Sequence, residues 1–170
     1  MDALFAWIEA SSLSTWIREA DTILAFQGIL VLHAWGMGFL AGGNAVVDLR
    51  ILGAARRIPL PAMAGFFPLL WISFAASLIS GVLLLIAYPT KALTNPLFYV
   101  KLVAVALAIG LMPVIRDRVL HAQSAEGSVA AKGKALAAVS LALWIVVIGA
   151  GRLLAYTYSR LMAYSQDTGF

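Results

Sequence analysis

The sequence predicts an all-α membrane protein, a bundle of four transmembrane helices with an N-terminal interfacial helix. Of its 170 residues, 62% are hydrophobic and only 12% are charged, and the mean hydropathy is +0.93. A soluble domain is about half apolar and about a quarter charged. Four apolar runs are each long enough to cross about 30 Å of hydrocarbon, and they lie at approximately 22–47, 64–89, 97–120 and 134–157. They lack the alternation of apolar and polar residues that transmembrane strands show, which favours helices.

The first twenty residues differ from the rest because they mix aromatic and acidic side chains. The segment begins with an acidic residue, Asp2, whereas a secretory signal begins with basic ones. Its apolar side chains fit one face of a short helix lying on a membrane surface: Leu4, Phe5, Ile8, Leu13, Trp16 and Ile17. We therefore expect an interfacial amphipathic segment at 1–20 and a four-helix transmembrane domain at 21–170. A loosely structured leader is the alternative for 1–20.

Proline residues mark the connections between the runs. Pro59 and Pro61 precede the second run, and Pro89 and Pro96 flank the connection to the third. Pro113 lies near the end of the third run, where a kink is tolerated if neighbouring groups satisfy the freed backbone.

The basic residues predict the orientation in the membrane. The connections after the first and third runs contain seven of them: Arg50, Arg56, Arg57, Arg116, Arg118, Lys132 and Lys134. The opposite side has four: Arg18, Lys91, Arg152 and Arg160. The positive-inside rule then places these two connections in the cytoplasm and both termini on the outer, periplasmic side. The net charge of +4 indicates topology and contact with anionic lipids rather than nucleic-acid binding.

The most informative residue is His33, in the middle of the first run. An ionisable group at bilayer depth is costly to insert and marks a candidate functional site, and a neutral imidazole is the commonest metal ligand. At 1.5 Å per residue, His33 lies roughly 16 Å from the outer start of its run, near the midplane. A structural imidazole, bonded to a serine or carbonyl of a neighbouring helix, is the alternative.

Two cations on other runs suggest a b-type haem at this histidine. Lys101 lies about 6 Å below the outer surface, and Arg152 lies at a similar depth. His33 would ligate the iron while Lys101 and Arg152 held the propionates, a carboxylate being suited to the fork of an arginine. Tyr99 and Tyr156 lie at the same end and could add hydroxyl donors. The chain has no cysteine, which excludes thiolate metal sites and covalent haem attachment.

Other residues near His33 leave alternatives open. Gly36 lies one turn away on the same face, where a missing side chain would let a flat macrocycle approach, but such small residues also allow close helix packing. His121 is some 20 Å away in depth, so it cannot ligate the same iron. The sixth ligand could be Lys101, Met37, water, a substrate, or His33 of a second protomer.

Three motifs carry a resemblance to a known family. His-Ala-Trp-Gly at 33–36, followed by Asp-Leu-Arg-Ile-Leu-Gly at 48–53, resembles small four-helix bacterial membrane proteins of unassigned function. Asn-Pro-Leu-Phe-Tyr-Val-Lys at 95–101 is similar to the Asn-Pro-x-Phe-x-x-Lys that opens the third helix in that family. The resemblance covers roughly 20–155 and implies the bacterial inner (plasma) membrane.

A more distant similarity is to copper-resistance D proteins and membrane protoporphyrinogen oxidases. In the oxidases a histidine in an early helix and a lysine opening a later one are linked with haem, which by position implies His33 and Lys101. Relatives often have an acidic residue three positions before the histidine, where this chain has Leu30.

At the cytoplasmic end, we expect Asp48 to pair with Arg116 or Arg118.

These observations favour a haem-b electron-transfer or membrane-anchor subunit over a stand-alone enzyme. Its partners would be the lipid bilayer and a quinone or redox partner protein, and its small-residue faces predict a homo-oligomer or a subunit of a larger membrane complex. The alternatives are a haem-free scaffold or small-solute carrier subunit and, ranked last, a pigment-binding accessory subunit with His33 on chlorophyll magnesium. No carboxylate is expected at mid-membrane, which argues against an acid-based proton pump.

Overall fold

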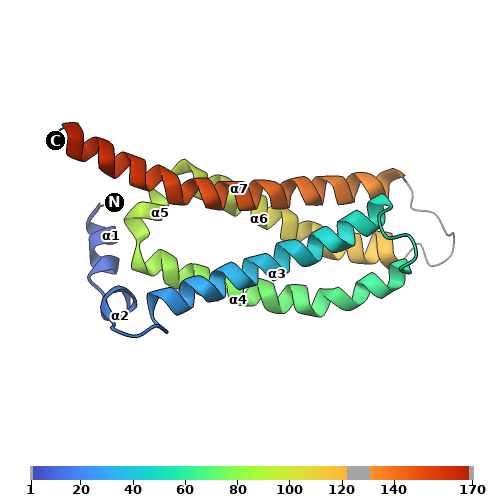
Figure 1. Ribbon diagram of the computed structural model, residues 1–170, viewed down its shortest axis with the longest axis horizontal. Coiled ribbons are helices and arrows are strands. Elements are labelled where there is room, and N and C mark those ends of the chain that lie inside the picture. Colours follow the sequence, from blue (N-terminus) through green and yellow to red (C-terminus); the bar gives the residue numbers. More distant parts are fainter. Residues whose placement is uncertain (1, 122–130, 169–170) are drawn as a thin grey trace.

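The computed structural model describes residues 2–121 and 131–168, and the regular structure in these ranges is helical throughout (Figure 1). Four helices in these ranges are long and apolar enough to cross a membrane: Phe26–Leu52, Leu60–Ala87, Pro96–Leu120 and Ala131–Leu154. The all-α, four-helix prediction is therefore confirmed, with boundaries that differ by a few residues.

The N-terminal segment forms two short helices rather than the one expected. Helix α1 spans Asp2–Glu9 and α2 spans Ser12–Glu19. Ser11 separates them because its hydroxyl accepts a hydrogen bond from the Ser14 backbone N–H at 3.3 Å and so caps α2. Ile17 is fully buried in a cluster with Ile29 and Ala87, so α2 is attached to the bundle. Leu4, Trp7 and Trp16 stay exposed.

Helix α3 spans Phe26–Leu52, so it begins four residues later than the run predicted from hydropathy. It ends at Gly53, whose φ of +113° lies in the left-handed region that favours glycine. The Gly53 N–H donates to the carbonyls of Leu49 and Arg50, and the Arg50 side chain donates to the carbonyl of Ile58 at 2.6 Å. The glycine and arginine of the motif at 48–53 thus end the helix and hold the following loop.

The remaining elements complete two antiparallel helix pairs. After the 3-10 helix η1 (Leu60–Phe66) come α4 (Phe67–Ala87), the short α5 (Pro89–Leu93), α6 (Pro96–Ile115), the π-helix η2 (Arg116–His121) and α7 (Ala131–Thr168). Asn95 caps α6: its side-chain oxygen accepts from the Leu97 N–H, and its amide donates to the Thr157 hydroxyl on α7 at 3.0 Å. The motif that begins at Asn95 therefore fixes both the start of α6 and its contact with α7.

Packing is uneven along the bundle. Helix α3 packs against α4 and α7, and α6 packs against α7, whereas α4 and α6 make no comparable contact (Figure 1). The apolar core fills the half of the bundle next to η1 and η2, where its largest fully buried side chains include Leu40, Ile51, Leu70, Met112 and Trp144. The other half, towards α1, α2 and α5, has less core and contains the pocket described below.

The prediction that Asp48 forms an ion pair with Arg116 or Arg118 is wrong. Asp48 is 1% exposed, and its Oδ2 has no hydrogen-bond partner, whereas Arg116 and Arg118 are exposed. The Arg116 guanidinium lies over the ring of Phe67, 5.8 Å from its centroid. Asp48 occupies the inner face of α3 instead of its solvent face, so among the described residues it forms no ion pair.

Gly36 lies in the contact between α3 and α4, where an added side-chain atom would clash, and its replacement tests this packing. A Cβ at Gly36 would lie 2.6 Å from Ser77 Oγ and 3.0 Å from the Ser73 carbonyl oxygen, so backbone must shift. We expect Gly36→Ala to destabilise the protein by about 1–3 kcal/mol, the usual cost of overpacking. Thermal unfolding in detergent, followed by circular dichroism, measures it.

Gly38→Ala is the matched control, because a Cβ at Gly38 meets nothing within 4 Å. It should leave the unfolding midpoint unchanged or raise it slightly, since alanine is the better helix former. Equal midpoints for the two variants would contradict the α3–α4 contact.

Candidate functional site

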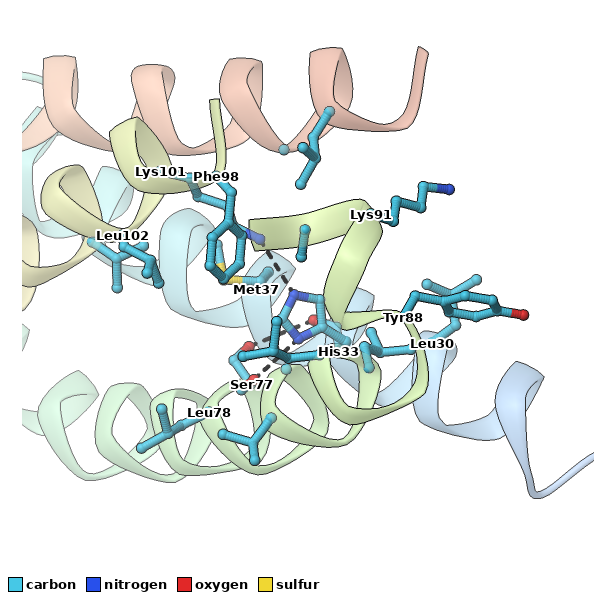
Figure 2. Close-up of a pocket in the computed structure, with 18 of the residues that line it drawn as sticks. Leu30, His33, Met37, Ser77, Leu78, Tyr88, Lys91, Phe98, Lys101 and Leu102 are labelled. Carbon is cyan, nitrogen blue, oxygen red and sulfur yellow. Dashed lines mark hydrogen bonds between the residues drawn. The ribbon is translucent and has the colours of Figure 1, made fainter. Parts of the chain in front are cut away.

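His33 and Lys101 meet at the wall of a pocket, although they come from different helices. The Nε2 atom of His33 lies 3.5 Å from Nζ of Lys101 (Figure 2). Because α3 begins at Phe26, His33 lies roughly 10 Å along its helix, and Lys101 lies roughly 8 Å along α6. The roughly 16 Å expected for His33 was counted from residue 22. Counted from the first residues of their helices, the two side chains lie at similar distances, which lets them meet.

The opposite ring nitrogen is held by α4. His33 Nδ1 lies 3.0 Å from the Ser77 carbonyl oxygen and 3.2 Å from Ser80 Oγ. A carbonyl oxygen only accepts hydrogen bonds, so Nδ1 carries the proton and Nε2 keeps its lone pair. The Ser80 hydroxyl donates to the Ala76 carbonyl at 2.6 Å, which leaves its oxygen free to accept from Nδ1.

This arrangement is the one expected for a structural histidine bonded to a serine and a carbonyl. It is also the tautomer of a metal-ligating histidine, which commonly donates its second N–H to a backbone carbonyl. The two hypotheses therefore share the Nδ1 side and differ only in what occupies Nε2. The Ser77 carbonyl and Ser80 hydroxyl supply the hydrogen-bonding partner that Leu30 cannot.

Gly81 leaves space for the His33 imidazole against α4. A Cβ there would lie 3.1 Å from His33 Cε1 and 3.4 Å from Nδ1, so a larger residue would push the ring towards the pocket. Sequence reasoning did not assign Ser77, Ser80 or Gly81 to the site. The available signal was the group Ser77, Ser80 and Gly81, two hydroxyls and a glycine within about one helical turn of an apolar helix.

The pocket has a volume of about 520 Å³, within the range of small-molecule sites. Its walls are mainly apolar side chains of α3, α4 and α6, and α5 closes one end (Figure 2). Leu78 and Val82 of α4 and Leu102 of α6 line it and are also exposed, so it opens sideways between these two helices. Lys91 also lines the pocket, but its amine points away from the imidazole (Figure 2).

The structure separates the other predicted site residues. Tyr99 lines the pocket, and its hydroxyl donates to the Leu93 carbonyl at 3.0 Å. Gly36 instead faces Ser73 and Ser77 in the α3–α4 contact and does not line the pocket.

Arg152 and Tyr156 also lie outside the pocket lining. They contact each other on the exposed side of α7, with Arg152 Nη2 2.9 Å from the Tyr156 hydroxyl and the guanidinium 5.1 Å from the ring centroid. His121 is the last residue of η2, at the opposite end of the bundle from α5 (Figure 1).

His33 offers a nitrogen lone pair to the pocket, where it could bind a metal. Within the described residues there is no group of three histidine, cysteine or acidic side chains able to hold a bare metal ion. Haem iron needs only one or two protein ligands, because the macrocycle provides the others. His33 with its bound Nδ1 meets that requirement.

No protein-family model, no curated protein and no solved structure matches the chain. The resemblance drawn from the three motifs therefore stays a prediction, and the site is interpreted from its own geometry.

The tautomer of His33 can be measured directly. Nitrogen NMR of protein labelled with ¹⁵N-histidine should show one histidine whose Nδ1 carries the proton and whose Nε2 has a lone pair. His121→Gln assigns the signals, since the chain has only two histidines. A protonated Nε2 with a bare Nδ1 would contradict the hydrogen bond to the Ser77 carbonyl.

Proposed function

We propose that this chain is an integral membrane protein whose four long helices cross the bilayer. Only 22–28% of each helix's apolar window is buried within the structure, so most of these apolar side chains keep some exposed surface. Contiguous exposed apolar surface of this extent is typical of lipid contact. The exposed Trp7 and Trp16 fit a segment lying at the membrane interface, where tryptophan is enriched.

The charge distribution supports an orientation with both termini on the outer side. Helix α1 and the last turns of α7 lie at one end of the bundle, and the arginines of the loop after α3 and of η2 lie at the other (Figure 1). The basic end would face the cytoplasm of a bacterial inner membrane.

Single cysteines test this orientation, because the native chain has none. In intact cells with a permeable outer membrane, a membrane-impermeant maleimide should label Ser12→Cys but not Arg57→Cys. After the inner membrane is disrupted, both should react, since both positions are exposed. Labelling of Arg57→Cys alone in intact cells would show the reverse orientation.

Within that membrane domain, we propose that the pocket holds a b-type haem with His33 as an iron ligand through Nε2. The observation that carries the proposal is the His33–Lys101 pair. Nε2 of His33 and Nζ of Lys101 lie 3.5 Å apart at the pocket wall, so both nitrogens would be available to hold one haem group, and Lys101 would be the favoured second ligand.

Three further features fit the group. The Ser77 carbonyl orients the imidazole with its lone pair towards the pocket, the walls are mainly apolar, and Gly81 leaves room for the ring. Haem would supply one-electron chemistry, and the surrounding residues would bind and orient it and exclude water. The pocket's opening towards the hydrocarbon suits exchange with a quinone, and a protein partner would complete electron transfer. Arg152 has no part in this version of the site.

A haem-free scaffold or carrier subunit is the second candidate, because each nitrogen of His33 already has a partner within the protein. In that case His33 and Lys101 form a polar contact between α3 and α6. The presence of bound iron and of a Soret absorption band decides between the two candidates.

The haem proposal predicts a Soret band and about one iron per chain in protein purified in detergent from haem-supplied cells. His33→Ala should lose the band, because the iron ligand is gone. Lys101→Arg separates the two roles of Lys101: arginine keeps a positive charge for a propionate but cannot ligate iron. We expect this variant to retain some haem with a shifted band and an altered spin state.

Arg152→Gln is the matched control, a cation at the same end that does not line the pocket. Its spectrum should equal that of the unmodified protein. Colourless, iron-free protein that can also not be loaded with added haemin would reject the proposal in favour of the scaffold or carrier.

A further inference from the structure

A second polar cluster lies in the bundle, far from the pocket and between α3 and α7. Asp48 and Asn44 are one turn apart on α3, and Ser140 and Trp144 are one turn apart on α7. All four side chains are at least 96% buried, since their exposed fractions are 1%, 4%, 0% and 1% respectively. Helices α3 and α7 are in contact, and Ser140 lies near Asp48. Because the two helices are antiparallel, Asn44 and Trp144 follow one turn further in the same direction.

The cluster is polar but lacks hydrogen bonds. Asp48 Oδ2, Ser140 Oγ and Trp144 Nε1 have no hydrogen-bond partner. Asn44 uses its amide to donate to the Leu40 carbonyl at 2.8 Å. Unpartnered polar atoms this deeply buried are uncommon and call for an unseen partner, such as a proton, a water or an ion.

No described cation neutralises Asp48. The elements packed on this part of α3 are α7, η1 and α4, and η1 and α4 contain no titratable side chain. Arg50 donates to the Ile58 and Arg56 carbonyls, and the other charged groups at this end are exposed: Arg56, Arg57, Arg116, Asp117, Arg118, Lys132 and Lys134. A buried carboxylate without a countercharge neutralises by taking up a proton.

We propose that Asp48 is a proton-binding site, held as a neutral carboxylic acid between α3 and α7. Protonated, its carboxyl both donates and accepts, so it can donate to Ser140 Oγ while its carbonyl oxygen accepts. Binding is simple association: a carboxylate oxygen takes one proton from water at the basic end of the bundle, and no other bond changes. The site lies about 22 Å along α3 from His33, so it does not depend on the haem proposal.

Dicyclohexylcarbodiimide tests the proposal on the intact protein in detergent. This apolar reagent adds to a protonated carboxyl: the acid's proton moves to a reagent nitrogen, the carboxyl oxygen bonds to the central carbon, and rearrangement leaves a stable N-acylurea. Peptide mass spectrometry should find Asp48 modified, with the yield falling several-fold as the pH is raised. Asp48→Asn should remove this adduct, and Asp117→Asn, which changes an exposed acid at the same end, should not.

Infrared spectroscopy of the unmodified protein gives an independent answer. A carbonyl band of a protonated carboxyl should be present at neutral pH, shift in D₂O and be absent from Asp48→Asn. Absence of the band from the unmodified protein would show an ionised Asp48 and overturn the proposal. Suppression of the labelling by sodium chloride but not by choline chloride would show a cation site and would also overturn it.

Discussion

The hydrogen bond from His33 Nδ1 to the Ser77 carbonyl is the constraint on which the site depends. It crosses from α3 to α4 at 3.0 Å, and it is allowed by glycine on each helix: Gly36 lets the backbones approach, and Gly81 leaves room for the ring. In a low-dielectric surrounding such a bond is stronger than in water. It fixes which nitrogen carries the proton, and so it determines that the lone pair faces Lys101 and the pocket.

One half of the bundle is tightly packed, and the other half contains the pocket. Large apolar side chains fill the basic half, whereas in the other half α4 and α6 diverge and leave the pocket between them. Asn95 is the residue that secures the divergent half, because it starts α6 and ties it to Thr157 on α7. A cavity beside a firmly packed core can keep its shape without a ligand, which lowers the ordering cost of binding.

Most of the fold could be predicted from the sequence, because hydropathy and proline positions identify long apolar helices with little ambiguity. The site could be predicted only in part. His33 and Lys101 stood out as ionisable residues within long apolar runs. Their contact depended on α3 beginning at Phe26, which a turn at 21–25 decides. The predicted role of Arg152 lacks support because depth alone does not specify which face of α7 a residue occupies. The predicted ion pair of Asp48 was wrong for the same reason: the sequence places Asp48 near a helix end but does not show that its side chain is buried.

The sideways opening between α4 and α6 has a consequence for how any ligand is supplied. In the proposed membrane setting, a compound that reaches the pocket past exposed Leu78, Val82 and Leu102 would arrive from the bilayer or micelle and not from the aqueous buffer. Its occupancy then follows its mole fraction among lipids, and a weak intrinsic affinity can suffice for a compound that partitions strongly. Ligand concentrations in titrations of this protein therefore need to be expressed per lipid or detergent molecule. At a fixed molar concentration in water, the amount of ligand per micelle would change whenever the detergent concentration changed.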